Sequence, residues 1–380
     1  MIYFDNAATS FPKPEPVYRS VDDTLRKIGA NPGRSGHKMS LQAERIVFDT
    51  RESVTDLFKI PNSSRVIFTS NATASLNIGI KGFLNKGNHV ITTSTEHNSV
   101  TRPLETLKDR GIEVSKIQCA PDGTIDIKEI EKSVKKNTKM IITTHASNVI
   151  GTILPLAEIG QIARDNNIIF MVDASQTAGC IPIDVQSMNV DLLACPGHKS
   201  LLGPQGTGLL YIREGISLKT LYEGGTGSDS EKVQPDFLPD RYESGTLNTP
   251  GIAGLGAAIK YIQATGIERI REHEKRLTML FIEELRKITD AVIYGTSDID
   301  KRAPIVSFNI TGFDAANIAT ILSEDFDIMT RVGLHCSPDA HKTLDTFPLG
   351  TLRVSFNYFN TEDEIDAGVR AVKEIINSKC

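Results

Sequence analysis

From about residue 65 to residue 212, short apolar runs alternate with amphipathic stretches. The apolar runs predict strands, and they read RVIFTS, HVITTS, MIITTHAS, IIFMVDAS, VDLLAC and GTGLLYI. Between two of them, LPLAEIGQIARDNN has apolar residues at helical spacing and ends in a polar turn, as a crossover helix does. The alternation predicts an α/β domain with a mostly parallel sheet covered by helices. Right-handed crossovers would bring the carboxyl ends of the strands to one edge, where open sheets bind ligands.

The pattern changes after the segment SGTLNTPG. Residues 252–289 are rich in Ala, Ile, Leu, Glu and Arg and predict long helices. Two strand-like runs, APIVSFNI and TLRVSFN, and two helix-like runs, DAANIATILSE and TEDEIDAGVRAVKEIIN, follow. This order predicts a smaller α+β domain. Because no repeat or low-complexity linker precedes it, we expect two closely packed domains joined by helix.

Composition narrows the class of protein. The 380 residues are 39% hydrophobic and 23% charged, which is ordinary for a globular protein long enough to form two domains. A net charge of -5 offers no basic field for nucleic acid or anionic lipid. The N-terminus, MIYFDNAATSFPKP, has neither a basic start nor a long apolar run. We expect a cytoplasmic protein with no nucleic-acid partner and no membrane anchor.

The cysteines do not form a recognisable framework. There are five of them, an odd number, widely spread and without any C-x-x-C pair. That pattern argues against disulfide scaffolding and against a structural zinc site, so we expect no metal. Their positions are Cys119, Cys180, Cys195, Cys336 and Cys380.

Two polar segments follow predicted strands and carry groups suited to covalent cofactor chemistry. CPGHKSLLGPQGTG places Lys199 in a Gly- and Pro-rich loop, where burial can lower an amine pKa and favour a Schiff base with a carbonyl. A random lysine is more often a solvated surface charge. VDASQTAG places Asp173 at a strand end, where it could cap a helix or hold a proton on a pyridine nitrogen.

Two further segments complete the pattern. TSTEHNSV supplies His97, which could be structural or could stack on an aromatic cofactor. TSNATASLN places Thr73 at a predicted helix start, where free N–H groups and the helix dipole favour phosphate. All four segments follow their own strands to the same sheet edge. Together they indicate pyridoxal 5'-phosphate as the cofactor.

The chain resembles the class V, fold-type I pyridoxal-phosphate enzymes. Within them it is most similar to the cysteine desulfurases and selenocysteine lyases, especially the short-loop branch that includes the sulfur-mobilisation desulfurases. The motifs that carry the resemblance run nearly end to end: YFDNAAT, NPGRSGH, NATASLN, EHNS, HASNVIGTILPL, VDASQTAG, PGHKSLLGPQGTGLLY, ESGTLNTPGIAGLGAAI, RVGLHC and LRVSFNYFNTEDEID. The resemblance implies an α/β fold whose large domain, residues 14–255, has a mostly parallel seven-stranded sheet. Residues 1–13 and 256–380 would form a small α+β domain that carries the catalytic cysteine.

The resemblance also implies roles around the cofactor. Lys199 would form the Schiff base, Asp173 would pair with the pyridine nitrogen and Gln176 would bond the phenolic oxygen. His97 would stack on the ring. Thr73 and His198 would bind the phosphate.

One position departs from the family pattern. Relatives often carry a serine before the Gly-His-Lys, and its hydroxyl binds phosphate, whereas this chain has Pro196. Proline offers no donor there, so phosphate binding would depend on the other groups. Thr246 resembles the residue that reaches the phosphate of a neighbouring subunit, which implies a homodimer with shared active sites. Asn148 and Arg353 match the residues that hold the substrate carboxylate, a task that suits a planar guanidinium.

RVGLHCSPDAH leaves three interpretations of Cys336: a buried small hydrophobe, a metal ligand or a nucleophile. Free cysteines are most often buried, and His335 and His341 lack the further ligand that a metal would need. The segment matches the catalytic-cysteine segment of the family, which implies a thiolate nucleophile that becomes a persulfide. Arg353 follows only 17 positions later, so the loop is short and a sulfur acceptor would have to approach the enzyme.

The implied activity is a desulfurase that converts L-cysteine to L-alanine, with His97 as acid–base partner of Lys199, and passes the sulfur through Cys336 to an acceptor protein or reductant. Three alternatives stay open. A selenocysteine lyase would use the same groups on L-selenocysteine, and in a class V aminotransferase Cys336 would be incidental. A binding protein on a decayed enzyme fold is the third, although Lys199, Asp173, His97 and Arg353 are intact.

Overall fold

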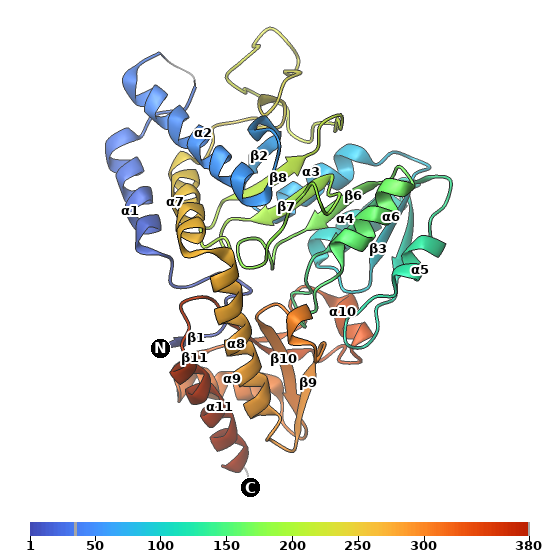
Figure 1. Ribbon diagram of the computed structural model, residues 1–380, viewed down its shortest axis with the longest axis vertical. Coiled ribbons are helices and arrows are strands. Elements are labelled where there is room, and N and C mark those ends of the chain that lie inside the picture. Colours follow the sequence, from blue (N-terminus) through green and yellow to red (C-terminus); the bar gives the residue numbers. More distant parts are fainter. Residues whose placement is uncertain (34–35, 379–380) are drawn as a thin grey trace.

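The computed structural model describes residues 1–33 and 36–378, so Cys380 and part of the NPGRSGH motif lie outside the described residues. The chain forms a large α/β unit and a smaller unit below it in Figure 1. Helix α8 extends from the large unit into the small one, as the sequence predicts. No helix among the described residues has the length and apolar character needed to cross a membrane.

A seven-stranded mixed sheet forms the centre of the large unit, with strand order β2-β8-β7-β6-β5-β3-β4. Only β8 runs antiparallel to its neighbours, so the prediction of a mostly parallel sheet is confirmed. The strands are β2 (Val66–Thr69), β3 (His89–Thr93), β4 (Glu113–Ile117), β5 (Thr138–Thr144), β6 (Ile169–Asp173), β7 (Leu192–Pro196) and β8 (Gly208–Ile212). The apolar runs predicted six of these strands. Edge strand β4 reads EVSKI and has only one fully buried residue, so its sequence gives no apolar run.

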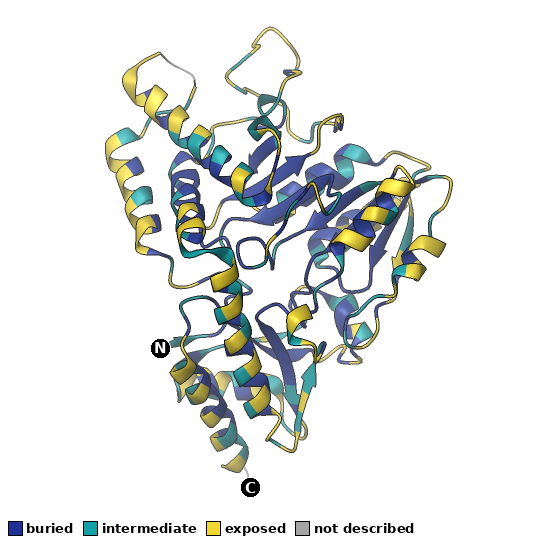
Figure 2. Cartoon of the chain, viewed as in Figure 1, coloured by how far each residue is buried: buried dark blue, intermediate teal, exposed yellow. Residues whose placement is uncertain are grey.

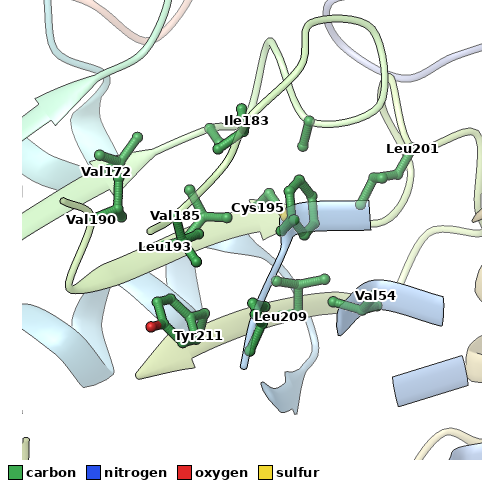
Figure 3. Packing of buried hydrophobic residues seen from close by; sticks show 14 of the residues in the cluster. Val54, Val172, Ile183, Val185, Val190, Leu193, Cys195, Leu201, Leu209 and Tyr211 are labelled. Carbon is green, nitrogen blue, oxygen red and sulfur yellow. The ribbon is translucent and has the colours of Figure 1, made fainter. Parts of the chain in front are cut away.

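Helices cover both faces of this sheet. They are α1 (Glu15–Asp23), α2 (Lys38–Phe58), α3 (Ala72–Phe83), α4 (Asn98–Lys108), α5 (Ile127–Lys132), α6 (Leu156–Asp165) and α7 (Thr249–Thr265). One apolar core joins one sheet face to α2, α6 and α7, and Figure 3 shows its packing around β7 and β8. A second core joins the other face to α3 and α4. Figure 2 shows the buried sheet between helices whose outer faces are exposed.

The small unit contains a four-stranded antiparallel sheet, ordered β12-β13-β10-β9, and a parallel pair, β1 with β11. Helices α8, α9 and α11 pack with this sheet around a separate apolar core. The strands are β1 (Ile2–Tyr3), β9 (Ala291–Tyr294), β10 (Ile305–Ile310), β11 (Ile328–Met329), β12 (Arg331–Gly333) and β13 (Thr351–Ser355). The helices are α8 (Ile267–Leu285), α9 (Ala315–Glu324), α10 (Pro338–Thr343) and α11 (Glu362–Asn377). Short helical turns span Thr24–Ile28, Ser63–Arg65, Asp240–Tyr242 and Ile299–Lys301.

The first residues of the chain belong to the small unit by their contacts. Strand β1 pairs with β11, and Phe4 is buried in the core of the small unit. These contacts support the assignment of residues 1–13 to the small domain, although the exact boundaries stay a prediction. The N-terminal segment then continues to the carboxyl edge of the large sheet, where it contacts the loop of Lys199.

Candidate active site

The carboxyl ends of the strands converge as predicted, and a cavity of about 190 Å³ lies at that edge. The parallel strands β2, β3, β6 and β7 all end there, each followed by one of the polar segments singled out in the sequence. The predicted site residues that line the cavity are Thr73, His97, Asn148, Asp173, Gln176, His198 and Lys199. Thr246, Arg353 and Cys336 lie outside its wall.

Lys199 carries the amine at the centre of this edge. The surrounding protein desolvates the amine, which lowers the pKa of Lys199 to about 8, although Asp173 opposes the shift. The guanidinium groups of Arg331 and Arg353 lower the pKa further. The neutral, nucleophilic form of Lys199 is therefore much better populated near neutral pH than that of a surface lysine.

Asp173 is the last residue of β6 and is almost fully buried. Its Oδ1 accepts hydrogen bonds from the N–H of Ser175 at 2.9 Å and from the Ser175 hydroxyl. None of the described residues donates a hydrogen bond to Oδ2. The carboxylate is thus held by one oxygen, and the other is available to an N–H in the cavity.

His97 caps the start of α4. Its Nδ1 accepts the N–H of Ser99 at 3.0 Å and lies 2.9 Å from the Ser99 hydroxyl oxygen. Burial lowers the pKa of His97 to about 4, and the nearby Asp173 only partly opposes this. The ring is therefore neutral at neutral pH. Since Nδ1 is the acceptor, Nε2 carries the proton.

Helix α3 and the loop before Lys199 supply the groups predicted to bind phosphate. The first N–H groups of α3 have no intrahelical partner, because no helical turn precedes them. Among them, the Asn71 side chain accepts the N–H of Ala74 at 2.9 Å. Burial, with the positive charges of Lys199 and Lys13, lowers the pKa of His198 to about 4. Its Nδ1 is buried without a hydrogen-bond partner among the described residues. An unsatisfied polar atom beside a cavity indicates a site for a polar ligand.

Ser99 is a site residue that the sequence analysis missed. Its hydroxyl lies 2.8 Å from that of Thr73 and also contacts His97, and Ser99 lines the cavity. Pro196 lines the same cavity without a donor. The hydroxyls of Thr73 and Ser99 are therefore the side-chain donors that can take the place of the serine that the family usually has there.

Residues 7–13 of the N-terminal segment hydrogen-bond to the loop that carries Lys199 and to Gln176. The Ser10 hydroxyl donates to the carbonyl oxygen of Lys199 at 2.8 Å. The His198 carbonyl accepts the N–H of Ser10 at 3.0 Å and the Lys13 amine at 2.8 Å. Gln176, which lines the cavity, donates from Nε2 to the Ala7 carbonyl at 3.2 Å. The predicted phenolic-oxygen ligand is thus also tied to this segment.

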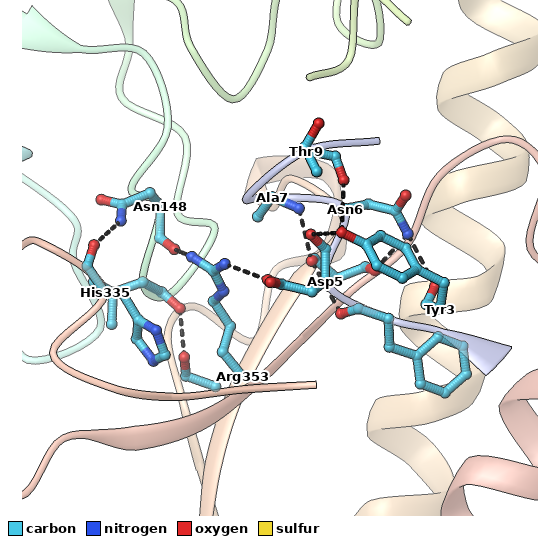
Figure 4. Close-up of polar contacts among 12 residues, drawn as sticks. Tyr3, Asp5, Asn6, Ala7, Thr9, Asn148, His335 and Arg353 are labelled. Atoms are coloured by element: carbon cyan, nitrogen blue, oxygen red, sulfur yellow. Dashed lines mark hydrogen bonds and ion pairs between the residues drawn. The ribbon is translucent and has the colours of Figure 1, made fainter. Parts of the chain in front are cut away.

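Arg353 lies between the two units and is 2% exposed. Its Nη1 donates to the Asn148 carbonyl at 2.8 Å, and its Nη2 binds Asp5 Oδ1 at 2.8 Å (Figure 4). Nε is buried without a partner among the described residues. The guanidinium is therefore fixed in orientation and still has N–H capacity for an anion.

Cys336 occupies a tight turn next to the cavity. The N–H of Ser337 donates to the Leu334 carbonyl at 2.8 Å, and both central residues, His335 and Cys336, have positive φ, 48° and 59°. That combination defines turns of the I′ type, which normally require Gly, Asn or Asp. For other residues it costs roughly 1–3 kcal/mol each, so the surrounding structure must hold the turn. Of the free cysteines in residues 1–33 and 36–378, only Cys336 is exposed.

Thr246 lies elsewhere. It lines a different cavity, of about 330 Å³, together with Tyr222, Thr207 and Asn248. Within one chain, the structure does not bring Thr246 to the cavity of Lys199. Its predicted contact with the phosphate of a neighbouring subunit therefore requires a second chain.

Comparison with known proteins shows the family to which the chain belongs. The profile described as "Aminotransferase class-V" matches residues 2–367. The chain belongs to the class-V aminotransferase family. A protein of Methanothermobacter thermautotrophicus named "Probable cysteine desulfurase" is 36% identical over 98% of this chain and 94% of its own length. A protein of Pyrococcus abyssi with the same name is 34% identical over 100% and 95%.

Solved structures of family members match the fold closely. The apo structure of a cysteine desulfurase from Thermococcus onnurineus has a TM-score of 0.94 at 34% identity and covers 99% of this chain and 95% of that chain. The cysteine desulfurase CsdA (S-sulfonic acid) from Escherichia coli has a TM-score of 0.89 at 26% identity and covers 99% and 94%. The predicted family and fold type are confirmed.

Enzymes of this family depend on pyridoxal phosphate, and the residues of the cavity fit it. A desolvated amine, a buried carboxylate with one free oxygen, a neutral histidine and the unsatisfied Nδ1 of His198 all belong to residues that line this cavity. These groups match the aldehyde, pyridine nitrogen, ring face and phosphate of the cofactor, respectively.

Proposed function

We propose that this protein is a cysteine desulfurase that converts L-cysteine to L-alanine and transfers the sulfur to Cys336, from which an acceptor removes it. The observation that carries the proposal is the exposed Cys336 turn beside a cavity with the groups for pyridoxal phosphate. The names of the relatives in Methanothermobacter and Pyrococcus support the same substrate.

In this proposal the substrate carboxylate binds at the junction of the two units. Arg353 Nε is buried and unpaired, and Asn148 lines the cavity nearby, so both can donate to one carboxylate. Asp5 and the Asn148 carbonyl fix the guanidinium before the substrate arrives. Preorganised donors of this kind bind an anion without losing further side-chain entropy.

Lys199 and His97 handle the protons. Bound pyridoxal phosphate supplies an electron sink for the substrate α-carbon, and Asp173 supports this by holding the pyridine N–H. The amine of Lys199 then removes the α-proton, a role that its pKa of about 8 suits. His97, whose Nδ1 accepts the N–H of Ser99, has its proton on Nε2, from which it can donate to the reacting centre.

Cys336 receives the sulfur. Its thiolate attacks the sulfur of the substrate, forming an S–S bond while the bond from that sulfur to the β-carbon breaks. The electron pair stays on the substrate carbon, which takes up a proton, so L-cysteine and the Cys336 thiol give L-alanine and a Cys336 persulfide. No further oxidant or reductant is needed for this half of the cycle.

The acceptor has to approach Cys336, because the segment that follows the cysteine is anchored. Ala340 and Leu344, in and after α10, pack against Val149 and Ile150 of the large unit. The Thr343 hydroxyl accepts from Gln118 at 3.0 Å. A persulfide on this turn cannot travel far, which supports the expectation of an acceptor protein or reductant that comes to the enzyme. We also propose a homodimer in which Thr246, which lines a separate cavity of its own chain, completes the phosphate site of the other chain.

The experiment compares the wild type with Cys336→Ala and, as a control for a buried thiol, Cys119→Ala. L-Alanine formed from L-cysteine with a reductant is measured together with the visible absorbance of the cofactor. We expect Cys336→Ala to keep the absorbance and lose alanine formation, and Cys119→Ala to keep both. Equal activity of wild type and Cys336→Ala would refute the proposal, and turnover of L-selenocysteine or of keto acids would then identify the alternative.

A further inference from the structure

Two consecutive left-handed residues present the Cys336 thiol, and their hydrogen bonds come from one asparagine and one helix start. Asn148 Nδ2 donates to the His335 carbonyl at 2.7 Å. The first N–H of α4, from Asn98, donates to the Cys336 carbonyl at 2.8 Å. Since neither carbonyl can reverse its role, these bonds fix both peptide planes of the turn.

Ser337 completes the connection. It is fully buried, and its hydroxyl donates to Asn148 Oδ1 at 2.7 Å. A carbonyl oxygen only accepts, so the His335 contact fixes the amide with Nδ2 toward the turn and Oδ1 toward Ser337. Both ends of the Asn148 amide are thus bonded to residues that flank Cys336.

The backbone of Asn148 extends the same connection to Arg353. Its carbonyl accepts from Arg353 Nη1 at 2.8 Å, and Figure 4 shows Asn148 between Arg353 and His335. One residue therefore joins the guanidinium to the turn of the nucleophile. One N–H of the amide is used at His335, and the second has no hydrogen-bond partner among the described residues.

We propose that Ser337 and Asn148 are positioning residues that hold the His335–Cys336 turn and thereby present the thiol, and that Asn148 joins this turn to the guanidinium of Arg353 in one hydrogen-bonded unit. The expected effect of this turn on kcat rests on the proposed function. The hydrogen bonds that hold the turn can be tested whether or not the protein has this activity.

Ser337→Ala tests the proposal, because Ser337 does not line the cavity and its hydroxyl, within residues 1–33 and 36–378, hydrogen-bonds only to Asn148. We expect faster hydrogen exchange in a peptide spanning residues 334–337, where the Ser337 N–H closes the turn. We expect kcat for alanine formation to fall about 10- to 100-fold, because a small misplacement of a reacting atom costs that much. KM for L-cysteine and the rate of the cofactor absorbance change on mixing with L-cysteine should stay within about twofold of the wild type.

Two further variants make the result specific. Ser337→Thr keeps the hydroxyl and should restore both exchange and kcat, whereas Ser53→Ala removes a buried hydroxyl that bonds only within α2 and should change neither. Asn148→Asp keeps the size of the side chain but, when ionised, cannot donate to the His335 carbonyl. It should accelerate the same exchange even if Ser337→Ala does not fold.

Unchanged exchange in Ser337→Ala would overturn the proposal, and so would faster exchange with wild-type kcat. A rise in KM with kcat unaltered would also overturn it, because Ser337 would then act on substrate binding. If the wild type makes no alanine from L-cysteine, the proposed function fails, while the exchange measurement still decides whether the turn is held as inferred.

Discussion

The substitution Arg353→Lys tests whether Arg353 binds the substrate carboxylate or only stabilises the folded protein. The guanidinium spans two partners, the Asn148 carbonyl and Asp5, each at 2.8 Å, and its buried Nε is unpaired. A lysine keeps the charge but presents all its donors from one atom, so it cannot reproduce the contacts with the Asn148 carbonyl and Asp5 together with the Nε bond to a carboxylate.

The size of the effect follows from the bonds lost. A hydrogen bond to a charged group is worth about 1.5–3 kcal/mol, and burial prevents solvent from replacing it. Loss of one such bond to the substrate carboxylate, about 2 kcal/mol, corresponds to a rise in KM of about 30-fold. Loss of one such bond within the protein, also about 2 kcal/mol, should lower the melting temperature of a 380-residue chain by about 2–3 °C, because the unfolding entropy scales with chain length.

Arg302→Lys is the matched control. Arg302 is also 2% exposed, but it donates only to backbone carbonyls of the small unit, those of Ile305, Thr296 and Tyr294. Initial rates of alanine formation across L-cysteine concentrations and thermal melts would be measured for both variants. Both should melt earlier, and only Arg353→Lys should raise KM. If Arg353→Lys melts early but keeps KM within about twofold, Arg353 is structural and the assignment of the carboxylate site is wrong.

Two further predictions concern stability. Burial raises the folded pKa of Glu274 from its ordinary value of 4.5 to about 8, so the folded protein binds the extra proton and stability should fall as pH rises through this window. Glu274→Gln should therefore gain melting temperature relative to the wild type between pH 5 and pH 8.5, and a constant difference would contradict this. Glu243 forms a buried two-pronged ion pair with Arg51, at 2.9 and 3.0 Å. Glu243→Ala leaves that charge unpaired and should cost about 3–5 kcal/mol in urea unfolding, with a smaller cost for Glu243→Gln; equal costs would show that the charge is unimportant.

The sequence predicted the parts of the fold that depend on local pattern. Apolar runs of β-branched and aliphatic residues marked six strands of the large sheet, because buried parallel strands need apolar residues on both faces. The same reasoning could not find β4, whose EVSKI sequence lies at a partly exposed edge. It also could not give the direction of β8, because an isolated apolar run looks the same in either orientation.

Serine residues show the same limit within the site. Lys199, Asp173 and His97 stood out because each is a chemically distinctive residue after a strand. Ser99 and Ser337 are distinguished by their bonds to His97, Thr73 and Asn148, whereas serine itself is common in turns and loops of every kind. Only the positions of their partners distinguish them.

The sequence by itself determined which groups are available and, through the order of strands, which of them meet at one sheet edge. The tertiary structure decided how these groups are paired, protonated and oriented. Asp5 and Arg353 are 348 positions apart and pair only because the N-terminal segment folds back beside β13. The pKa of Lys199 and the turn of Cys336 likewise depend on burial and on hydrogen bonds from distant segments. Local pattern sets secondary structure, whereas desolvation and orientation depend on neighbours that the chain brings together only when folded.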